Sequence, residues 1–181
     1  MSAKYYYFAV SLPFLEFEVP SEYSLPRFLD DCERLLSPGD LAEMRGALEV
    51  WENSDRDVSN PTARAWKNFV RNLRNQAASV RATHARKDPD KYIRGSREVE
   101  LDIVEAVKLA DKSPDPLSGE KILQRLCWRR LDDLAGGHFF DLDFLIIQGL
   151  RLQLLARFEK EASVRGGHVF EEYEKSLAGL R

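Results

Sequence analysis

Cysteine and histidine are scarce in this sequence, and the motifs that usually carry enzyme chemistry are missing. The chain has 2 cysteines and 3 histidines among 181 residues, and their positions do not match a zinc-ligand spacing. It contains no P-loop, no GxGxxG, no GxSxG and no HExxH sequence. Because phosphate-cradling loops, nucleophile elbows and metalloprotease sites depend on these patterns, the sequence predicts a protein that is not an enzyme and uses no cofactor.

Long uninterrupted hydrophobic runs are also missing. The most apolar stretch, residues 144–158, is interrupted by two glutamines and two arginines, whereas a membrane-spanning helix needs about 18 or more consecutive apolar residues. Pro13 and Glu16 follow the apolar residues 5–10 too closely for a secretory signal peptide. We therefore expect a cytoplasmic protein that does not span a membrane and that reaches its inner face, if at all, peripherally through a partner.

The charges are nearly balanced, with 27 Lys and Arg against 30 Asp and Glu and a net charge of −3. This value does not by itself indicate an acidic or basic partner. Hydrophobic residues make up 44% of the chain and recur along nearly all of it, as in a globular protein. A domain of this length needs no disulfide, so we interpret Cys32 and Cys127, which occupy apolar helix positions, as buried reduced thiols.

Helical spacing of apolar residues covers most of the sequence. Capping residues or prolines precede most of these stretches, which predict helices over residues 24–36, 37–51, 60–87, 116–135 and 142–158. A further helix should be capped by Ser96, with Glu98 and Glu100 in its first turn, and a last short one should end near residue 178. Residues 4–15 are rich in aromatic residues and contain Pro13, so we expect an extended segment or short strand there. The predicted fold class is all-α, a multi-helix bundle of about six to seven helices with a short extended N-terminal segment.

The domain organisation follows from the same pattern. Residues 1–181 should form a single helical domain, either undivided or made of an N-terminal lobe (1–112) and a C-terminal lobe (117–181). The linker at residues 112–116 carries two prolines and is the candidate boundary. The 142–158 helix is apolar nearly all round, which predicts that it is central in the bundle or covered by a partner.

The helix predicted from residue 60 has a basic face. No acidic residue occurs between residues 58 and 87, and five cations recur at helical spacing: Arg64, Lys67, Arg71, Arg74 and Arg81. Apolar residues form a separate stripe on the same helix, so one face is expected in the core and an adjoining face carries positive charge. We assign the five cations as candidate partner-binding residues.

Three interpretations of this basic stripe remain open at the level of sequence. The first is a solvated face neutralised by acids of neighbouring helices, such as Glu98, Glu100 and Asp102. The second is a surface for an acidic protein partner. The third is nucleic-acid binding, against which stand the acidic pI of 5.7 and the lack of a known nucleic-acid-binding motif.

Four consecutive aromatic residues at positions 5–8 are a second candidate for partner contacts. Four neighbours in a chain cannot all face one core, so some of them must cover an edge or contact another protein. We assign Tyr5, Tyr6 and Tyr7 to this possible role, while packing in the core remains an equal alternative.

Residues 136–143 combine one histidine with two carboxylates. His138, Asp141 and Asp143 could in principle bind a metal or act as an acid–base pair. The preceding Gly-Gly pair is a common helix stop, however, and Asp141 and Asp143 suit the start of the next helix. We therefore favour a structural role here and predict no metal site.

Three segments resemble a family of small bacterial proteins that are encoded among the subunits of V-type (archaeal-like) ATPases. They are residues 4–13 (KYYYFAVSLP), 66–74 (WKNFVRNLR) and 126–134 (LCWRRLDDL) with the GHFFD that follows. The family looks distantly similar to the class of V-type ATPase subunits designated C (d in eukaryotes), whose all-helical members join the central shaft to the membrane rotor ring. The resemblance implies no particular functional residue.

This resemblance implies a non-catalytic accessory or structural subunit, or an assembly factor, in ATP-driven ion transport. Its partners would be V-type ATPase subunits of the central stalk or rotor, contacted through helix faces. The alternative is a helical nucleic-acid-binding or regulatory adaptor protein that uses the basic stripe between Arg64 and Arg81.

Overall fold

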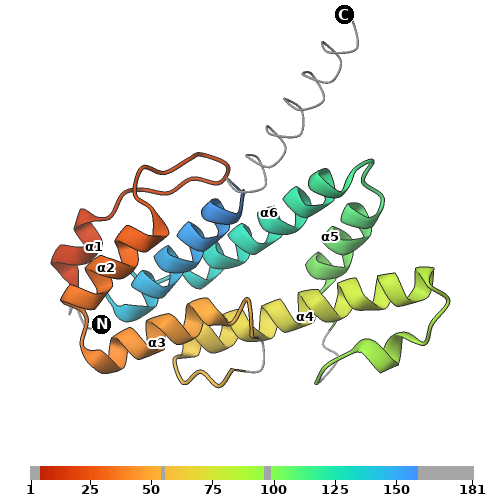
Figure 1. Ribbon diagram of the computed structural model, residues 1–181, viewed down its shortest axis with the longest axis horizontal. Coiled ribbons are helices and arrows are strands. Elements are labelled where there is room, and N and C mark those ends of the chain that lie inside the picture. Colours follow the sequence, from red (N-terminus) through yellow and green to blue (C-terminus); the bar gives the residue numbers. More distant parts are fainter. Residues whose placement is uncertain (1–4, 54–55, 96–98, 159–181) are drawn as a thin grey trace, which may run out of the picture.

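Helices account for 70% of the residues that the computed structural model describes, which are residues 5–53, 56–95 and 99–158. No strand occurs within these three ranges. The helices pack as a bundle, in which α3 lies beside the first half of α4 and α5 lies over its second half (Figure 1). The all-α fold class predicted from the sequence is therefore confirmed.

The helices are joined by connections of very different lengths, from residues 36–37 between α2 and α3 to residues 12–24 between α1 and α2. In chain order they are α1 (Tyr6–Ser11), α2 (Leu25–Leu35), α3 (Pro38–Glu49), α4 (Pro61–His84), the 3-10 helix η1 (Pro89–Tyr92), α5 (Leu101–Asp111) and α6 (Pro116–Leu134). Another helix begins at residue 142 and is described through residue 158. The short helix expected near residue 178 lies outside the described residues.

Most helices begin where the capping residues predict. Ser24, Ser37 and Asn60 each accept a hydrogen bond from the backbone N–H three residues further on, and a proline occupies the first turn of each helix. Asp141 accepts a hydrogen bond of 2.9 Å from the backbone N–H of Phe144. These bonds satisfy N–H groups that lack a partner inside the helix, which is why the helix starts could be read from the sequence.

The N-terminal segment differs from the prediction. Residues 6–11 form α1 instead of an extended strand, and helix-free chain follows over residues 12–24. The helix places Tyr5, Phe8 and Ala9 on one face, where they are buried. Phe8 stacks on Phe28 of α2 with ring centroids 5.9 Å apart. These tertiary contacts outweigh the strand preference of the aromatic residues.

The start of α5 also differs from the prediction. The helix begins at Leu101 with Glu100 as its N-cap residue, so Ser96 is not its cap. Both Ser96 and Glu98 lie outside the described residues. The side chain of Glu100 does not cap the helix but accepts hydrogen bonds from Asn72 of α4 and Arg130 of α6. This polar contact joins α4, α5 and α6 at the first turn of α5.

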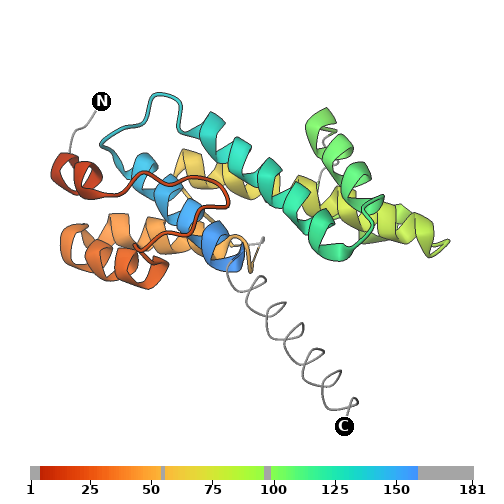
Figure 2. The same ribbon diagram turned by 90° about the horizontal axis from the view of Figure 1, so that it is seen from above.

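The connection between α5 and α6 is tight. Residues 112–115 reverse the chain, and α6 packs closely against α5 (Figure 2). A Cβ atom at Gly119 would lie 2.9 Å from the backbone oxygen of Ala110, so this approach requires a glycine. The contact lies at the candidate boundary between the two lobes that the sequence left open as an alternative to an undivided domain.

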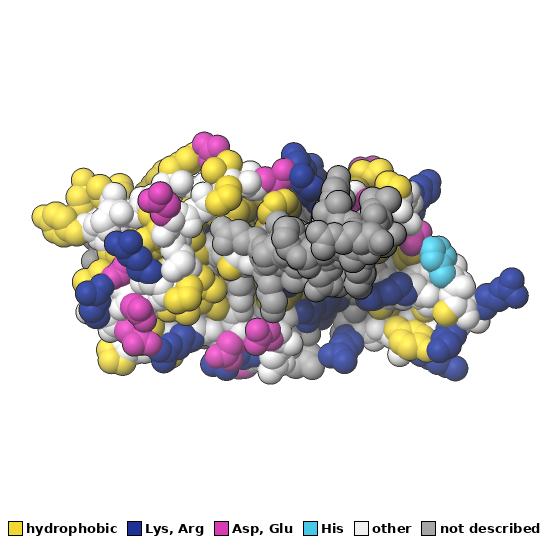
Figure 3. All heavy atoms as spheres, turned by 45° about the horizontal axis from the view of Figure 1, so that its top comes forward, with side chains coloured by type: hydrophobic (Ala, Val, Ile, Leu, Met, Phe, Trp, Pro, Cys, Tyr) yellow, Lys and Arg dark blue, Asp and Glu magenta, His cyan; other side chains and the backbone are white. Residues whose placement is uncertain are grey.

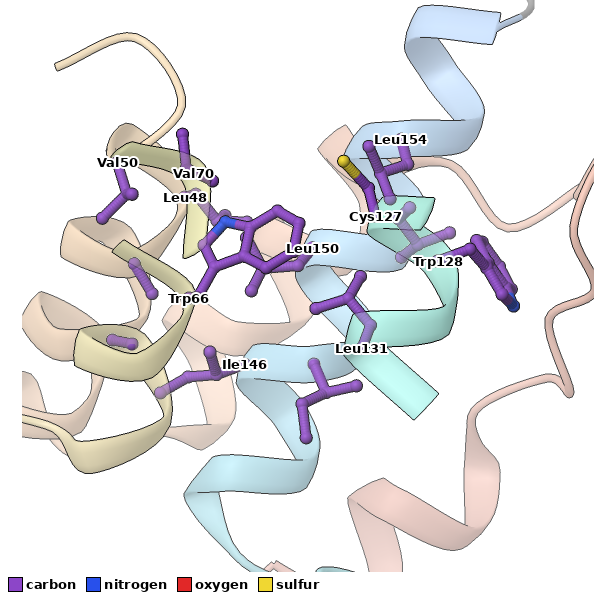
Figure 4. Close-up of a cluster of buried hydrophobic side chains, with 14 of the residues drawn as sticks. Leu48, Val50, Trp66, Val70, Cys127, Trp128, Leu131, Ile146, Leu150 and Leu154 are labelled. Atoms are coloured by element: carbon purple, nitrogen blue, oxygen red, sulfur yellow. The ribbon is translucent and has the colours of Figure 1, made fainter. Parts of the chain in front are cut away.

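The 142–158 helix lies at the centre of the described bundle. Its side chains Leu145, Ile146, Ile147 and Leu150 have 0% of their surface exposed. Figure 4 shows Ile146 and Leu150 between Trp66 of α4 on one side and Leu131 of α6 on the other. This arrangement buries apolar residues on opposite sides of one helix, as its all-round apolar sequence predicted.

Gly149 sets how closely this helix approaches α2 and α3. A Cβ atom there would lie 2.9 Å from Cε1 of Phe28 and 3.3 Å from both Cδ2 of Leu48 and Sδ of Met44. The ring of Phe28 and the side chain of Met44 are themselves completely buried. No side chain can therefore be added at position 149 without moving the core.

Among the described residues, no helix is both long enough and apolar enough to cross a membrane.

Replacing Gly149 by alanine tests this close packing. We expect Gly149→Ala to lower the free energy of unfolding by about 1–3 kcal/mol, because overpacking outweighs the better helix propensity of alanine. Gly39→Ala in α3 is the matched control, since no atom lies within 4 Å of its Cβ position. The control should change the stability by less than about 1 kcal/mol. Urea denaturation measures both, and equal stabilities of the two variants would contradict the packing argument.

Candidate functional site

The helix α4 has the two faces that its sequence predicted. Trp66, Phe69, Val70 and Leu73 are buried in the core. The five cations of the basic stripe lie on the adjoining surface, where Arg64 and Arg81 are exposed and Lys67, Arg71 and Arg74 are half-buried. The helix is therefore anchored by one face and presents its charges on another.

The stripe cations bond mainly to neutral acceptors. Arg64, Lys67, Arg74 and Arg81 donate to backbone oxygens of residues 59, 56, 51 and 77. Arg71 donates to the side-chain oxygen of Asn68 at 3.0 Å. Within the described ranges, none of the five cations forms an ion pair with a carboxylate. Their positive charges are thus not neutralised by these parts of the chain.

The acids that were candidates to neutralise the stripe are bound elsewhere. Glu100 pairs with Arg130, and Asp102 lies 3.3 Å from the same guanidinium group. The guanidinium also lies 4.7 Å from the centroid of the Phe69 ring. The first interpretation of the stripe is therefore wrong for Glu100 and Asp102, because Arg130 of α6 occupies both. Glu98 lies outside the described residues.

A hollow of about 330 Å³ lies beside the second half of α4. Its polar lining consists of Arg71, Arg74, Asn75, Arg81, Tyr92 and Arg94. No aspartate or glutamate from the described part of the chain lines it. We call this space the arginine hollow. In Figure 3 basic side chains lie at both ends of the face shown, and hydrophobic side chains are most numerous toward the left-hand end.

The wall of the hollow opposite α4 is held by an asparagine. The Asn75 amide donates to the backbone oxygen of Arg94 and accepts from its backbone N–H, each at 2.9 Å. Gly95 follows with φ of 68°, a conformation that favours glycine, and the side chain of Arg71 lies against it. These contacts fold residues 92–95 back onto α4 and bring Arg94 close to the stripe.

An apolar groove of about 350 Å³ adjoins the hollow. Its floor includes Val70, Leu73, Val107 and Leu123, and it shares Arg74 and Arg81 with the arginine hollow. Arg74 and Arg157 both lie over the ring of Trp51, at 5.7 Å and 4.5 Å from its centroid. The face of α4 thus offers positive charge and apolar surface side by side.

The electrostatics of Arg74 reflect this crowding. Burial lowers the pKa of Arg74, and the positive charges of Arg157 and Arg94 lower it further. Repulsion between neighbouring guanidinium groups makes their joint desolvation unfavourable. A negatively charged group bound here would reverse the sign of this local interaction.

The N-terminal aromatic residues divide between core and surface. Tyr5 is buried and its hydroxyl group donates to Asp40, so it is not available as a surface contact. Tyr6 and Tyr7 have 45% and 89% of their surface exposed. Tyr6 contacts the ring of Phe140 with centroids 4.7 Å apart, which extends the exposed aromatic surface to the 139–140 loop.

The His138 cluster is built around the start of the 142–158 helix. His138 Nδ1 lies 2.8 Å from Asp141 Oδ2 and 3.9 Å from Asp143 Oδ2. The other oxygen of Asp141 caps the helix, and the other oxygen of Asp143 accepts from Asn60 at 3.1 Å. Both carboxylates therefore have structural partners at a positive helix end, which agrees with their predicted structural role. One ligand atom from each of the three residues also lies within 4.8 Å of the others, so the absence of a metal stays a prediction.

Both cysteines are buried free thiols. Burial, with a smaller contribution from nearby carboxylates, raises the pKa of Cys32 and of Cys127 to about 12. Each thiol therefore stays protonated at neutral pH, where a nucleophilic thiolate would require a lowered pKa. This agrees with the structural role predicted for them.

The chain has no match among models of protein families, curated proteins or solved structures.

Sequence reasoning missed Asn75, Tyr92 and Arg94, which complete the arginine hollow. Tyr92 and Arg94 belong to a different segment from the stripe, and Asn75 shows no periodicity that marks it. The only local signal was Asp88-Pro89, which predicted the end of the long helix and allows the chain to turn back along it.

The raised thiol pKa values lead to a prediction about reactivity. We expect neither cysteine to react with Ellman's reagent in the folded protein at pH 8, whereas both should react in urea. The same rise in the thiol pKa also makes the free energy of unfolding depend on pH. The thiols stabilise the fold fully below their unfolded pKa of about 8.5, and this contribution is lost as the pH rises toward about 12. Rapid labelling of the native protein would contradict the buried placement.

Proposed function

We propose that this protein is a non-catalytic helical interaction module that binds an acidic protein partner on the basic face of α4. The observation that carries the proposal is the absence, within the described residues, of any carboxylate paired with Arg64, Lys67, Arg71, Arg74 or Arg81. A folded domain normally disperses such charges or pairs them. Here they are held on one face of a helix whose other face is anchored in the core.

The adjoining apolar groove supports a protein partner. Protein interfaces combine a desolvated apolar centre with charged residues at the rim, and arginine and aromatic residues are enriched in them. The groove beside α4 has an apolar floor, the aromatic ring of Trp51 and the guanidinium groups of Arg74, Arg81 and Arg157. Two carboxylates also line it, Asp111 beside His84 and Glu120 beside Arg157. Because the three guanidinium groups outnumber the two carboxylates, an acidic segment with apolar residues on one side matches the remaining positive charge and the apolar floor.

A V-type ATPase subunit is the partner that we propose to test first. The reason is the resemblance of residues 4–13, 66–74 and 126–141 to the family described above. In that role the protein would be an accessory or structural subunit, or an assembly factor, at the central stalk or rotor. Its contribution to ATP-driven ion transport would be mechanical or organisational, through helix-face contacts.

The exposed aromatic surface offers a second contact area. Tyr6, Tyr7, Val10 and Phe139 are exposed, and Val10 follows the two tyrosines at helical spacing on α1. Exposed aromatic clusters of this kind often mark protein contacts. We propose Tyr6 and Tyr7, but not the buried Tyr5, as partner-binding residues at this end.

Charge reversal at exposed positions tests the proposal. We expect Arg64→Glu/Arg81→Glu to reduce at least tenfold the amount of partner that co-purifies with the tagged protein from its own cells. Each exposed cation changes fold stability by only about 0–1 kcal/mol, so the circular dichroism spectrum should not change. Identification of V-type ATPase subunits among the partners lost in the variant would support the family assignment.

The matched control is Arg34→Glu/Arg129→Glu, which makes the same change in net charge at exposed positions of α2 and α6. It should leave the partner bound. Equal capture by wild type and both variants would refute docking on α4. Salt-sensitive retention of nucleic acid by the wild type in a filter-binding assay, lost in Arg64→Glu/Arg81→Glu, would instead favour the nucleic-acid adaptor.

A further inference from the structure

We infer that the arginine hollow is a binding site for a phosphate group, presented either by a small phosphate compound or by a phosphorylated side chain of the partner. The inference deepens the proposed function, because it assigns a specific ligand chemistry to one part of the same face. It is based on the geometry of the hollow, on the hydrogen-bond donors that remain there and on the charge of its lining.

The hollow concentrates guanidinium groups around a space of suitable size. Arg71, Arg74 and Arg81 line it from α4, and Arg94 lines it from the segment that Asn75 holds in place. The volume of about 330 Å³ exceeds that of a single phosphate group, so an ester substituent can also be accommodated. Tyr92 adds a hydroxyl group to the lining.

The three α4 arginines keep donors for a ligand. A guanidinium group has five N–H donors. Arg71 donates through Nη2 to Asn68, Arg74 through Nη2 to the backbone oxygen of residue 51, and Arg81 through Nε to the backbone oxygen of residue 77. Each group therefore retains N–H donors beyond the bond described. Arg71 Nε is enclosed by protein and has no acceptor among the described residues, so the donors that Arg71 can offer to a ligand are those on its Nη atoms.

Phosphate fits this donor set better than a carboxylate does. A phosphate ester carries about −1.5 to −2 charges and three acceptor oxygens at pH 7, whereas a carboxylate has one charge and two oxygens. Planar guanidinium groups bind such oxygens in pairs. The three oxygens of a phosphate ester therefore offer acceptors to more than one of the arginines that line the hollow, which a single carboxylate does to a lesser extent.

The charge of the lining also favours a phosphate group. No acidic residue of the described chain enters the hollow, and the neighbouring cations Arg157 and Arg94 make the protonated state of Arg74 less favourable than usual. Arg74 and Arg94 both line the hollow, and a dianion bound between them replaces their repulsion by attraction. Binding should therefore be measurable with inorganic phosphate alone.

The test is a titration of the full-length protein with sodium phosphate at constant ionic strength, followed by calorimetry and by thermal unfolding. We expect phosphate to bind at least tenfold more tightly than chloride or acetate. Sulfate, a dianion of similar shape, should also bind. Lowering the pH from 7.5 to 5.5 should weaken phosphate binding and leave sulfate binding unchanged, because only phosphate takes up a proton near pH 6–7.

Variants locate the site. Arg74→Gln/Arg81→Gln should raise the phosphate dissociation constant at least tenfold per arginine removed, as expected for charge-assisted hydrogen bonds. Arg81→Gln alone tests the same point if loss of Arg74 disturbs its contact with Trp51. Arg64→Gln is the matched control, because this cation lies on the same helix but not in the hollow. Phosphate binding no tighter than chloride binding, or unchanged in folded Arg81→Gln, would overturn the inference.

A second arm identifies the source of the phosphate group. The captured partner is treated with phosphatase and offered again to the wild-type protein. Loss of capture would place the phosphate group on the partner, and undiminished capture together with phosphate binding would indicate a small phosphate compound. Partner capture that persists while phosphate does not bind would refute the phosphate site alone, whereas phosphate binding without any partner would refute only the docking proposal.

Discussion

The close approach of the 142–158 helix to α2 and α3 at Gly149 is the constraint on which the rest of the structure depends. Phe28, Met44 and Leu48 occupy the space that a side chain at this position would need. Because the helix is apolar nearly all round, it must be covered on every side, and α3 and α4 cover one side while α6 covers another (Figure 4). The positions of the remaining helices follow from this requirement.

This arrangement determines which face of α4 remains for function. Trp66 and Val70 bury one face against the central helix (Figure 4), so the cations must lie on the face left over. In the second half of α4, residues 92–95 fold back along the helix and partly enclose Arg71, Arg74 and Arg81. Enclosing like charges is unfavourable for stability. We propose that an acidic partner, and a phosphate group in the hollow, compensate for this cost.

Most of the helices, several of their starting caps and the buried thiols could be predicted from the sequence alone, whereas α1 and the start of α5 could not. Ser24, Ser37 and Asn60 act on N–H groups three residues away, and helical periodicity places apolar side chains on one face within one or two turns. The basic stripe of α4 and the apolar side chains on all sides of the 142–158 helix could be recognised in the sequence for the same reason. All of these features depend on residues that are close together in the chain.

The contacts between these helices were decided only by the tertiary structure. It made residues 6–11 a helix by packing Phe8 on Phe28, and it paired Glu100 with Arg130 instead of with the stripe. It also brought Arg94 to α4 through Asn75, which completed the arginine hollow. These contacts join residues 19 to 30 positions apart, and they depend on how helices pack, which the local spacing of residues does not specify.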